Sequence, residues 1–129
     1  MTATLKRILY VEDEPDIQTI ARIALETVGG FTVEICSSGP EALEKVDAFA
    51  PDLILLDVMM PDMDGPSTMR ALRSQTGATD TPIIFITAKV QTQEVESYKA
   101  LGAIDVIAKP FDPMTLPAKI QEIWSKAHE

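Results

Sequence analysis

The sequence predicts an α/β fold in which a five-stranded parallel sheet is covered by helices on both faces. Five short apolar runs are separated by segments long enough to form helices. The central run, residues 53–56, contains no polar residue, which is typical of a strand buried on both faces. Strands that alternate with helices pair in parallel, because each helix carries the chain back to the same end of the sheet. We therefore predict a doubly wound sheet flanked by five helices.

The predicted strands are marked by aliphatic and β-branched residues. Residues 31–36 alternate between apolar and polar side chains, as in a strand with one buried face. Residues 83–87 consist only of β-branched or aromatic residues. The central strand ends in one carboxylate, Asp57, shortly before the break at Met60-Pro61. The five predicted strands are residues 8–11, 31–36, 53–57, 83–87 and 105–108.

Helices are predicted where apolar residues return every three or four positions. The first begins at Pro15 and ends at the Gly29-Gly30 pair. Asp112-Pro113 is typical of the start of the last helix, but Pro117 would then remove a hydrogen bond in its second turn. This helix therefore starts later or is bent at its beginning. The predicted helices are residues 15–28, 37–50, 66–73, about 91–101 and the segment after 112; the inward face of the first comprises Ile17, Ile20, Ala21, Ala24 and Val28.

Length and composition indicate a single domain over residues 1–129. Eleven basic and twenty acidic residues give a net charge of −9, which argues against nucleic-acid binding and is compatible with a divalent cation. Cys36 is the only cysteine, so no internal disulfide can form, and we expect it in the core near a strand end. No apolar stretch approaches the roughly 20 residues of a membrane helix. We expect a cytoplasmic protein without membrane contact.

Charged and hydroxyl side chains lie at the carboxyl ends of four predicted strands. Glu12 and Asp13 follow the first strand, Asp57 ends the third, Thr87 ends the fourth and Lys109 follows the fifth. Because these strand ends meet at one edge of a parallel sheet, we expect the five side chains to converge. Three carboxylates suit Mg²⁺, and an ammonium with a hydroxyl suits a phosphoryl group. The set therefore predicts phosphorylation of an aspartate beside a metal ion.

Each of these residues also has an ordinary explanation when considered alone. The acidic residues after the first strand could simply favour a helix N-terminus. Thr87 is a common type of strand residue, and Lys109 could be a surface lysine. Asp62 and Asp64 are interpreted only as turn and capping residues. The coincidence at four strand ends favours the functional interpretation.

Four motifs, in this order, resemble those of response-regulator receiver domains of bacterial two-component signalling. The resemblance covers residues 5–126. It implies a CheY-like (flavodoxin-like) sheet with strand order 2-1-3-4-5 and a signalling phosphoacceptor that is not a turnover enzyme. The matching motifs are Val11-Glu12-Asp13-Glu14, Leu55-Leu56-Asp57 followed by Met60-Pro61-Asp62-Met63-Asp64-Gly65, Ile86-Thr87-Ala88 and Lys109-Pro110-Phe111.

The resemblance implies roles for the acidic residues. Asp57 accepts a phosphoryl group from a phosphohistidine of a partner protein. Asp13 and Asp57 bind Mg²⁺, or Mn²⁺ in its place, together with the backbone carbonyl of Met59. Glu12 acts on the ion through a water molecule.

The resemblance also implies which groups hold the phosphoryl oxygens. These are the side chains of Thr87 and Lys109, helped by the backbone N–H groups of Met59 and Ala88. The Lys109-Pro110 peptide bond is expected to be cis.

Partner proteins are expected because nothing marks the single histidine, His128, as a phosphodonor. The donor should be a sensor histidine kinase or a histidine phosphotransfer protein. We expect no output domain after the last helix, so the signal passes through contact with a downstream protein or by onward phosphotransfer. The expected contact face comprises the fourth helix, fifth strand and fifth helix. The sequence does not separate a switch from a relay intermediate, nor a monomer from a phosphorylation-dependent dimer.

Three positions depart from the family pattern. Val106 stands where the family often has an aromatic residue that turns inward on phosphorylation. We therefore expect phosphorylation to remodel the loop after Thr87 and the following helix, with a smaller change at the fifth strand. Met59 and Lys89 are neither acids nor amides, so they are poorly suited to orienting a hydrolytic water.

Other classes of protein fit the sequence less well. A haloacid-dehalogenase-type phosphatase requires a second aspartate where Met59 stands. The glycine-rich motifs of nucleotide-binding proteins are missing from the sequence. The complete set of strand-end residues argues against a degenerate receiver that serves only as an interaction module.

Overall fold

The computed structural model describes residues 4–128 and contains one parallel five-stranded sheet. The strand order is β2-β1-β3-β4-β5, and every neighbouring pair is parallel. The predicted fold class and strand order are therefore confirmed. The strands are β1 (Arg7–Val11), β2 (Thr32–Cys36), β3 (Leu53–Asp57), β4 (Ile83–Thr87) and β5 (Asp105–Ala108).

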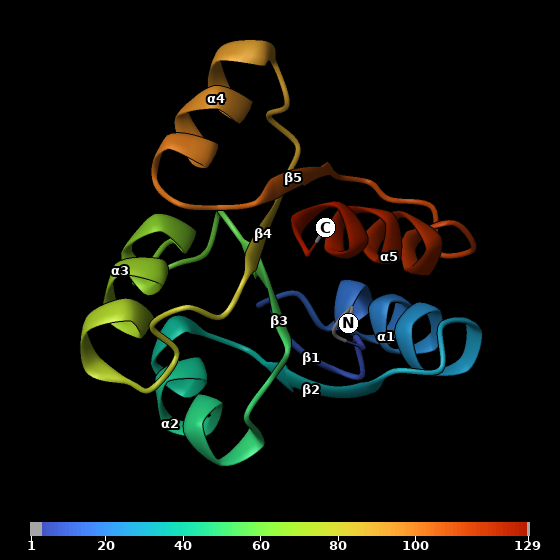
Figure 1. Cartoon of the computed structure of the whole chain (residues 1–129), viewed down its shortest axis with the longest axis horizontal. Helices are drawn as coiled ribbons and strands as arrows, with labels where there is room; N and C mark the ends of the chain where they lie inside the picture. The colour runs from blue at the N-terminus through green and yellow to red at the C-terminus, as the bar shows by residue number, and fades with distance from the viewer. Residues whose placement is uncertain (1–3, 129) are drawn as a thin grey trace.

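Helices cover both faces of the sheet (Figure 1). The helices α1 and α5 lie on one face, and α2, α3 and α4 lie on the other (Figure 1). Among residues 4–128, none of these helices combines the length and the apolar character needed to cross a membrane. Their bounds are α1 (Pro15–Arg22), continued by the π-helical segment η1 (Ile23–Val28), α2 (Gly39–Phe49), α3 (Gly65–Gln75), α4 (Thr92–Ala100) and α5 (Leu116–Ala127).

The strand β3 separates two hydrophobic clusters. Leu53 and Leu55 belong to the cluster beneath α1 and α5, whereas Ile54 and Leu56 belong to the cluster beneath α2 and α3. All four side chains are fully buried. Successive residues of a strand point to opposite faces, so this burial confirms the interpretation of the apolar run. Asp57 is the last residue of this buried strand and lies at the carboxyl edge of the sheet, where the parallel strands end.

The first helix differs from the prediction after Arg22. Its second part is π-helical, with the Gly29 N–H donating to the carbonyl of Ala24. A π turn holds more residues than an α turn, so later side chains shift around the axis. Leu25 is buried instead of Val28, which is 42% exposed. Ile20, which precedes the π-helical segment, is 43% exposed. The predicted inward positions of Ile20 and Val28 are therefore wrong.

The last helix begins at Leu116, so the alternative of a later start is confirmed. Pro117 lies in the first turn, where its missing N–H would have no partner within the helix. Asp112 precedes the helix and accepts the N–H of Met114 through its side chain at 2.9 Å. The prediction that Asp112-Pro113 directly caps this helix is therefore wrong, because Thr115 holds the N-cap position.

The helix α4 is the least embedded helix in the described part of the chain. None of its residues is buried. Its aromatic residue is Tyr98, whose ring packs edge-on against the buried ring of Phe85, with 5.2 Å between the ring centroids. Val106 of β5, the register partner of Phe85, packs against the same cluster as Tyr98. Tyr98 thus places an aromatic ring from α4 against Phe85, the register partner of Val106.

Candidate functional site

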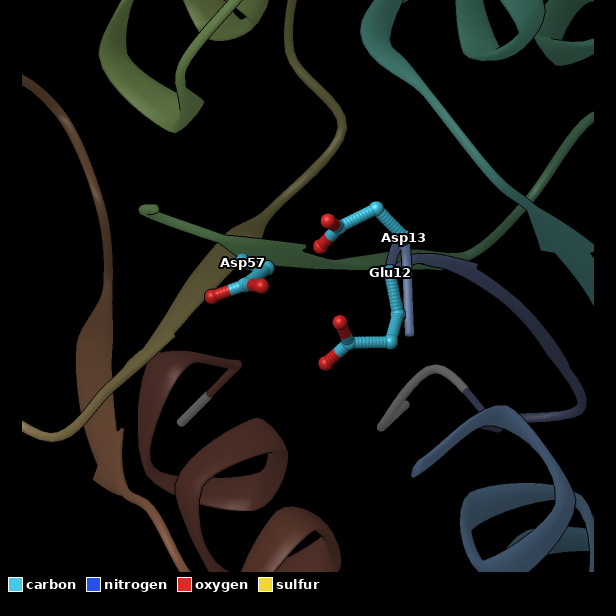
Figure 2. A group of neighbouring side chains, drawn as sticks. All are labelled: Glu12, Asp13 and Asp57. Atoms are coloured by element: carbon cyan, nitrogen blue, oxygen red, sulfur yellow. The ribbon is translucent and has the colours of Figure 1, made fainter. Parts of the chain in front are cut away.

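Three carboxylates converge at the carboxyl edge of the sheet. Glu12 and Asp13 directly follow β1, and Asp57 ends the neighbouring strand β3. One oxygen from each lies within 4.8 Å of the others. Figure 2 shows the three side chains grouped at this edge. Glu12 and Asp57 are buried and Asp13 is half-buried, so their charges are poorly screened by solvent.

Lys109 connects two of these carboxylates. Its Nζ lies 2.8 Å from Oε1 of Glu12 and 3.0 Å from Oδ2 of Asp57. The Lys109 N–H donates to the carbonyl of Thr87 at 2.9 Å, which fixes the backbone from which this side chain extends. The Lys109-Pro110 peptide bond is cis. The expected cis peptide is therefore confirmed. One ammonium thus partly balances three acidic groups.

Burial and the neighbouring charges shift the proton affinities at this edge. Burial raises the pKa of Asp57 to about 6; the hydrogen bond from Lys109 opposes this rise, and the charge of Glu12 adds to it. Burial by itself disfavours the charged form of Lys109, but its hydrogen bonds to Glu12 and Asp57 outweigh burial, so its pKa is raised. Lys109 therefore stays an ammonium at neutral pH, and Asp57 is a carboxylate that takes up a proton more readily than an ordinary aspartate.

The acidic group fits a divalent cation. Oδ1 of Asp13 is buried without a hydrogen-bond partner, which is costly for a carboxylate oxygen unless another positive group meets it. Carboxylate oxygens are the ligands that Mg²⁺ prefers, and it usually retains several waters. The triad of Glu12, Asp13 and Asp57 therefore has the ligand chemistry of a Mg²⁺ site.

The remaining predicted site residues are Thr87 and Met59. Thr87 is buried at the end of β4, and its Oγ1 accepts the N–H of Lys89 at 3.1 Å. Its neighbour Ile86 pairs in register with Asp57, so the hydroxyl belongs to the same edge. The side chain of Met59 is 66% exposed beyond the end of β3. The structure thus brings Glu12, Asp13, Asp57 and Lys109 into one cluster and keeps Thr87 adjacent to it.

Cys36 and the two aspartates interpreted as structural occupy the positions expected of them. Cys36 ends β2 and is fully buried, and burial raises the pKa of its thiol to about 12. Asp64 caps α3 by accepting the N–H of Ser67 at 2.8 Å. Asp62 has a φ of 68°, a turn conformation that aspartate tolerates.

Gly65 is a site-forming residue that the sequence interpretation treated only as part of a motif. A Cβ added at this position would lie 2.7 Å from the carbonyl oxygen of Asp57 and 2.9 Å from Cα of Val58. The Gly65 N–H also donates to the carbonyl of Val58 at 3.0 Å. The start of α3 therefore packs directly against the backbone that carries Asp57, which only glycine permits.

Tyr10 was not predicted to belong to the site. Its hydroxyl donates toward Oε1 of Glu12 at 3.4 Å, just beyond the end of β1. Burial, and after it the charges of Glu12 and Asp57, raise the pKa of this phenol, so it remains protonated. The two-residue spacing between Tyr10 and Glu12 was the available signal, because side chains two apart share a face of a strand.

The comparisons with known proteins agree with this geometry. The family described as "Response regulator receiver domain" matches residues 8–121. The DNA-binding response regulator MtrA of Mycolicibacterium smegmatis is 37% identical over 121 residues, covering 94% of this chain and 51% of that protein. The alkaline phosphatase synthesis transcriptional regulatory protein PhoP of Bacillus subtilis is 40% identical over 122 residues, covering 95% and 50%. The chain thus spans about half the length of these relatives.

Solved structures match over nearly their whole length. The chemotaxis protein CheY4 of Vibrio cholerae superposes with a TM-score of 0.83 at 32% identity, covering 93% of this chain and 99% of that chain. A CheY-like response regulator receiver domain protein from Methanospirillum hungatei gives a TM-score of 0.79 at 30% identity, covering 95% and 96%. The fold, the acidic edge and the sequence matches therefore lead to one conclusion. The chain belongs to the response-regulator receiver domains of two-component signalling, which act as signalling phosphoacceptors.

Proposed function

We propose that Asp57 accepts a phosphoryl group from a phosphohistidine of a partner protein in a Mg²⁺-dependent transfer. One observation carries the proposal: the buried Asp57 carboxylate lies among two further carboxylates and 3.0 Å from the Lys109 ammonium. A carboxylate in such a place is a nucleophile, while the ammonium provides charge for phosphoryl oxygens.

In the transfer, a carboxylate oxygen of Asp57 forms the new bond to phosphorus as the bond from phosphorus to the partner's imidazole nitrogen breaks. The bonding electron pair returns to the imidazole, which takes a proton, and the product is an aspartyl phosphate. Lys109 and Thr87 then donate hydrogen bonds to the phosphoryl oxygens. Thr87 can do so once its hydroxyl turns away from the Lys89 N–H.

The acidic residues hold the cation in this proposal. Asp13, Asp57 and the backbone carbonyl of Met59 would bind it directly, and Glu12 would bind it through water. Mg²⁺, or Mn²⁺ in its place, would supply positive charge for the phosphoryl group. The partnerless Oδ1 of Asp13 supports its assignment as a ligand.

A receiver domain implies a histidine kinase partner. We further propose that a histidine phosphotransfer protein can replace the kinase as donor, and that transfer takes place in the cytoplasm. The target-binding face comprises α4, β5 and α5, which lie together at one end of the sheet (Figure 1). The net charge of −9 supports a protein target over nucleic acid. Whether this domain acts alone or as a relay intermediate, and as a monomer or as a phosphorylation-dependent dimer, depends on those partners.

The test is incubation with Mg²⁺ and a small acyl-phosphate donor, followed by intact-protein mass spectrometry. The wild-type chain and the Asp62→Asn variant should each gain the mass of one phosphoryl group. Asp62 is a suitable control because it is an exposed aspartate on the same loop. The Asp57→Asn variant should gain none, and a persistent gain in that variant would overturn the proposal.

A further inference from the structure

Glu12 is a fully buried carboxylate that depends on three donors. Its Oε1 accepts Lys109 Nζ at 2.8 Å and the Tyr10 hydroxyl at 3.4 Å. Its Oε2 accepts the N–H of Glu14 at 3.1 Å. A buried carboxylate that loses its donors is strongly destabilised, so the fate of each donor matters for the acidic site.

Lys109 is the donor that must leave. It is shared between Glu12 and Asp57, and under the proposed function it turns to the phosphoryl oxygens when Asp57 is phosphorylated. Glu12 then keeps only the Glu14 N–H and the Tyr10 hydroxyl. The Tyr10 contact is at present longer than a strong O–H···O bond, since Lys109 occupies the same oxygen at a shorter distance.

We propose that Tyr10 is a positioning residue that holds the Glu12 carboxylate toward the metal site when Lys109 leaves it. Tyr10 is suited to this role because its ring is fully buried in the cluster beneath α1 and α5. Because the ring is held in the core, the Tyr10 hydroxyl stays within reach of Oε1 of Glu12 when the Lys109 side chain moves. Side chains that hydrogen-bond to metal-binding groups orient those groups, and their loss lowers metal affinity.

The inference rests on the proposed function, but its test does not require phosphorylation. Mg²⁺ binding is measured by isothermal titration calorimetry on the full chain, and metal-free unfolding is followed in parallel. Tyr10→Phe removes only the hydroxyl and keeps the buried ring. Tyr98→Phe, which removes a hydroxyl on α4, is the matched control. A Lys109→Met background reproduces the departure of the ammonium without any phosphoryl group.

We expect Tyr10→Phe to weaken Mg²⁺ binding by about threefold in the wild-type background, where Lys109 still holds Glu12. In the Lys109→Met background the same change should weaken binding by about tenfold. In the wild-type background Tyr10→Phe should change metal-free stability little, because Lys109 still meets Oε1 of Glu12, and Tyr98→Phe should match the wild type. A purely structural role would instead lower metal-free stability and weaken binding equally in both backgrounds.

Equal Mg²⁺ affinities with and without the Tyr10 hydroxyl in the Lys109→Met background would overturn the inference, as would failure of Tyr10→Phe to fold. Failure of the proposed function has a separate signature, because the wild-type chain would then gain no phosphoryl group at Asp57.

Discussion

Lys109 lets three carboxylates share one edge of the sheet. Like charges within 4.8 Å repel each other, and the desolvation of Asp57 adds to this cost. The ammonium offsets part of the repulsion by contacting Glu12 and Asp57 together. A divalent cation would offset the rest, which explains why proton uptake and metal binding should compete at Asp57.

This competition predicts that Mg²⁺ affinity falls as the pH is lowered through about 6. The cation binds the carboxylate form of Asp57, and its raised pKa means that a proton occupies the group below about pH 6. Binding should be nearly constant from pH 8 to 7 and roughly tenfold weaker at pH 5. Calorimetric titrations across this range provide the check, with Asp57→Asn as the control that lacks the titration. A flat affinity from pH 8 to 5 would contradict the account.

Met59 predicts a long-lived phosphoryl group. Its exposed thioether lies two residues beyond Asp57 and cannot orient an attacking water as an amide can. The aspartyl phosphate of Met59→Asn should therefore decay severalfold faster than that of the wild type. Met114→Asn, at an exposed methionine lining a surface hollow beside Val28 and Gln121, is the matched control. Equal decay rates in wild type and Met59→Asn would show that this position does not set the lifetime.

The elements around Asp57 are held by close backbone contact as well as by side chains. The start of α3 lies so close to the end of β3 at Gly65 that a Cβ there would collide with the backbone of Asp57 and Val58. On the other side, α4 has no buried residue and is joined to the site through the loop after Thr87. The site thus has one rigid neighbour and one loosely packed neighbour.

Gly65→Ala should damage both stability and the site. The new Cβ would collide with the backbone of Asp57 and Val58, which can yield only by shifting β3 or α3. We expect a loss of about 1–3 kcal/mol in the free energy of unfolding, together with weaker Mg²⁺ binding. Gly77→Ala is a useful control, because its nearest neighbour is the movable side-chain tip of Asp47 at 3.0 Å. Chemical denaturation and calorimetry measure the two effects; an unchanged Gly65→Ala would refute the close-contact argument.

Phosphorylation should change α4 more than β5. When Thr87 turns to the phosphoryl group, it releases the Lys89 N–H at the start of the loop before α4. Val106 lacks a large ring that could change rotamer, whereas Tyr98 can move with α4 against Phe85. Hydrogen exchange with and without beryllofluoride, a phosphoryl mimic, should change most over residues 88–100. A change of equal size at residues 105–108 would show that this idea is wrong.

At the scale of the whole molecule, the alternation of apolar runs predicts the parallel sheet and the convergence of its strand ends, whereas the strand order is implied by the resemblance to receiver domains. Chain pattern alone could not reveal the π-helical segment, in which Leu25 is buried and Val28 is exposed, because the pattern assumes a constant 3.6 residues per turn. Nor could it show that Lys109 bridges Glu12 and Asp57, or that Tyr10 reaches Glu12, since these contacts depend on side-chain placement across strands. That the chain has no output domain stays a prediction.

The central claim is that Asp57 alone receives the phosphoryl group. The most direct measurement phosphorylates the wild-type chain with a phosphohistidine donor and reduces it with borohydride, which converts an aspartyl phosphate to homoserine. Peptide mass spectrometry then locates the modified residue. We expect homoserine at position 57 only, and its yield should fall when Mg²⁺ is chelated. Homoserine at position 13, 62 or 64, with or without homoserine at position 57, would contradict the account.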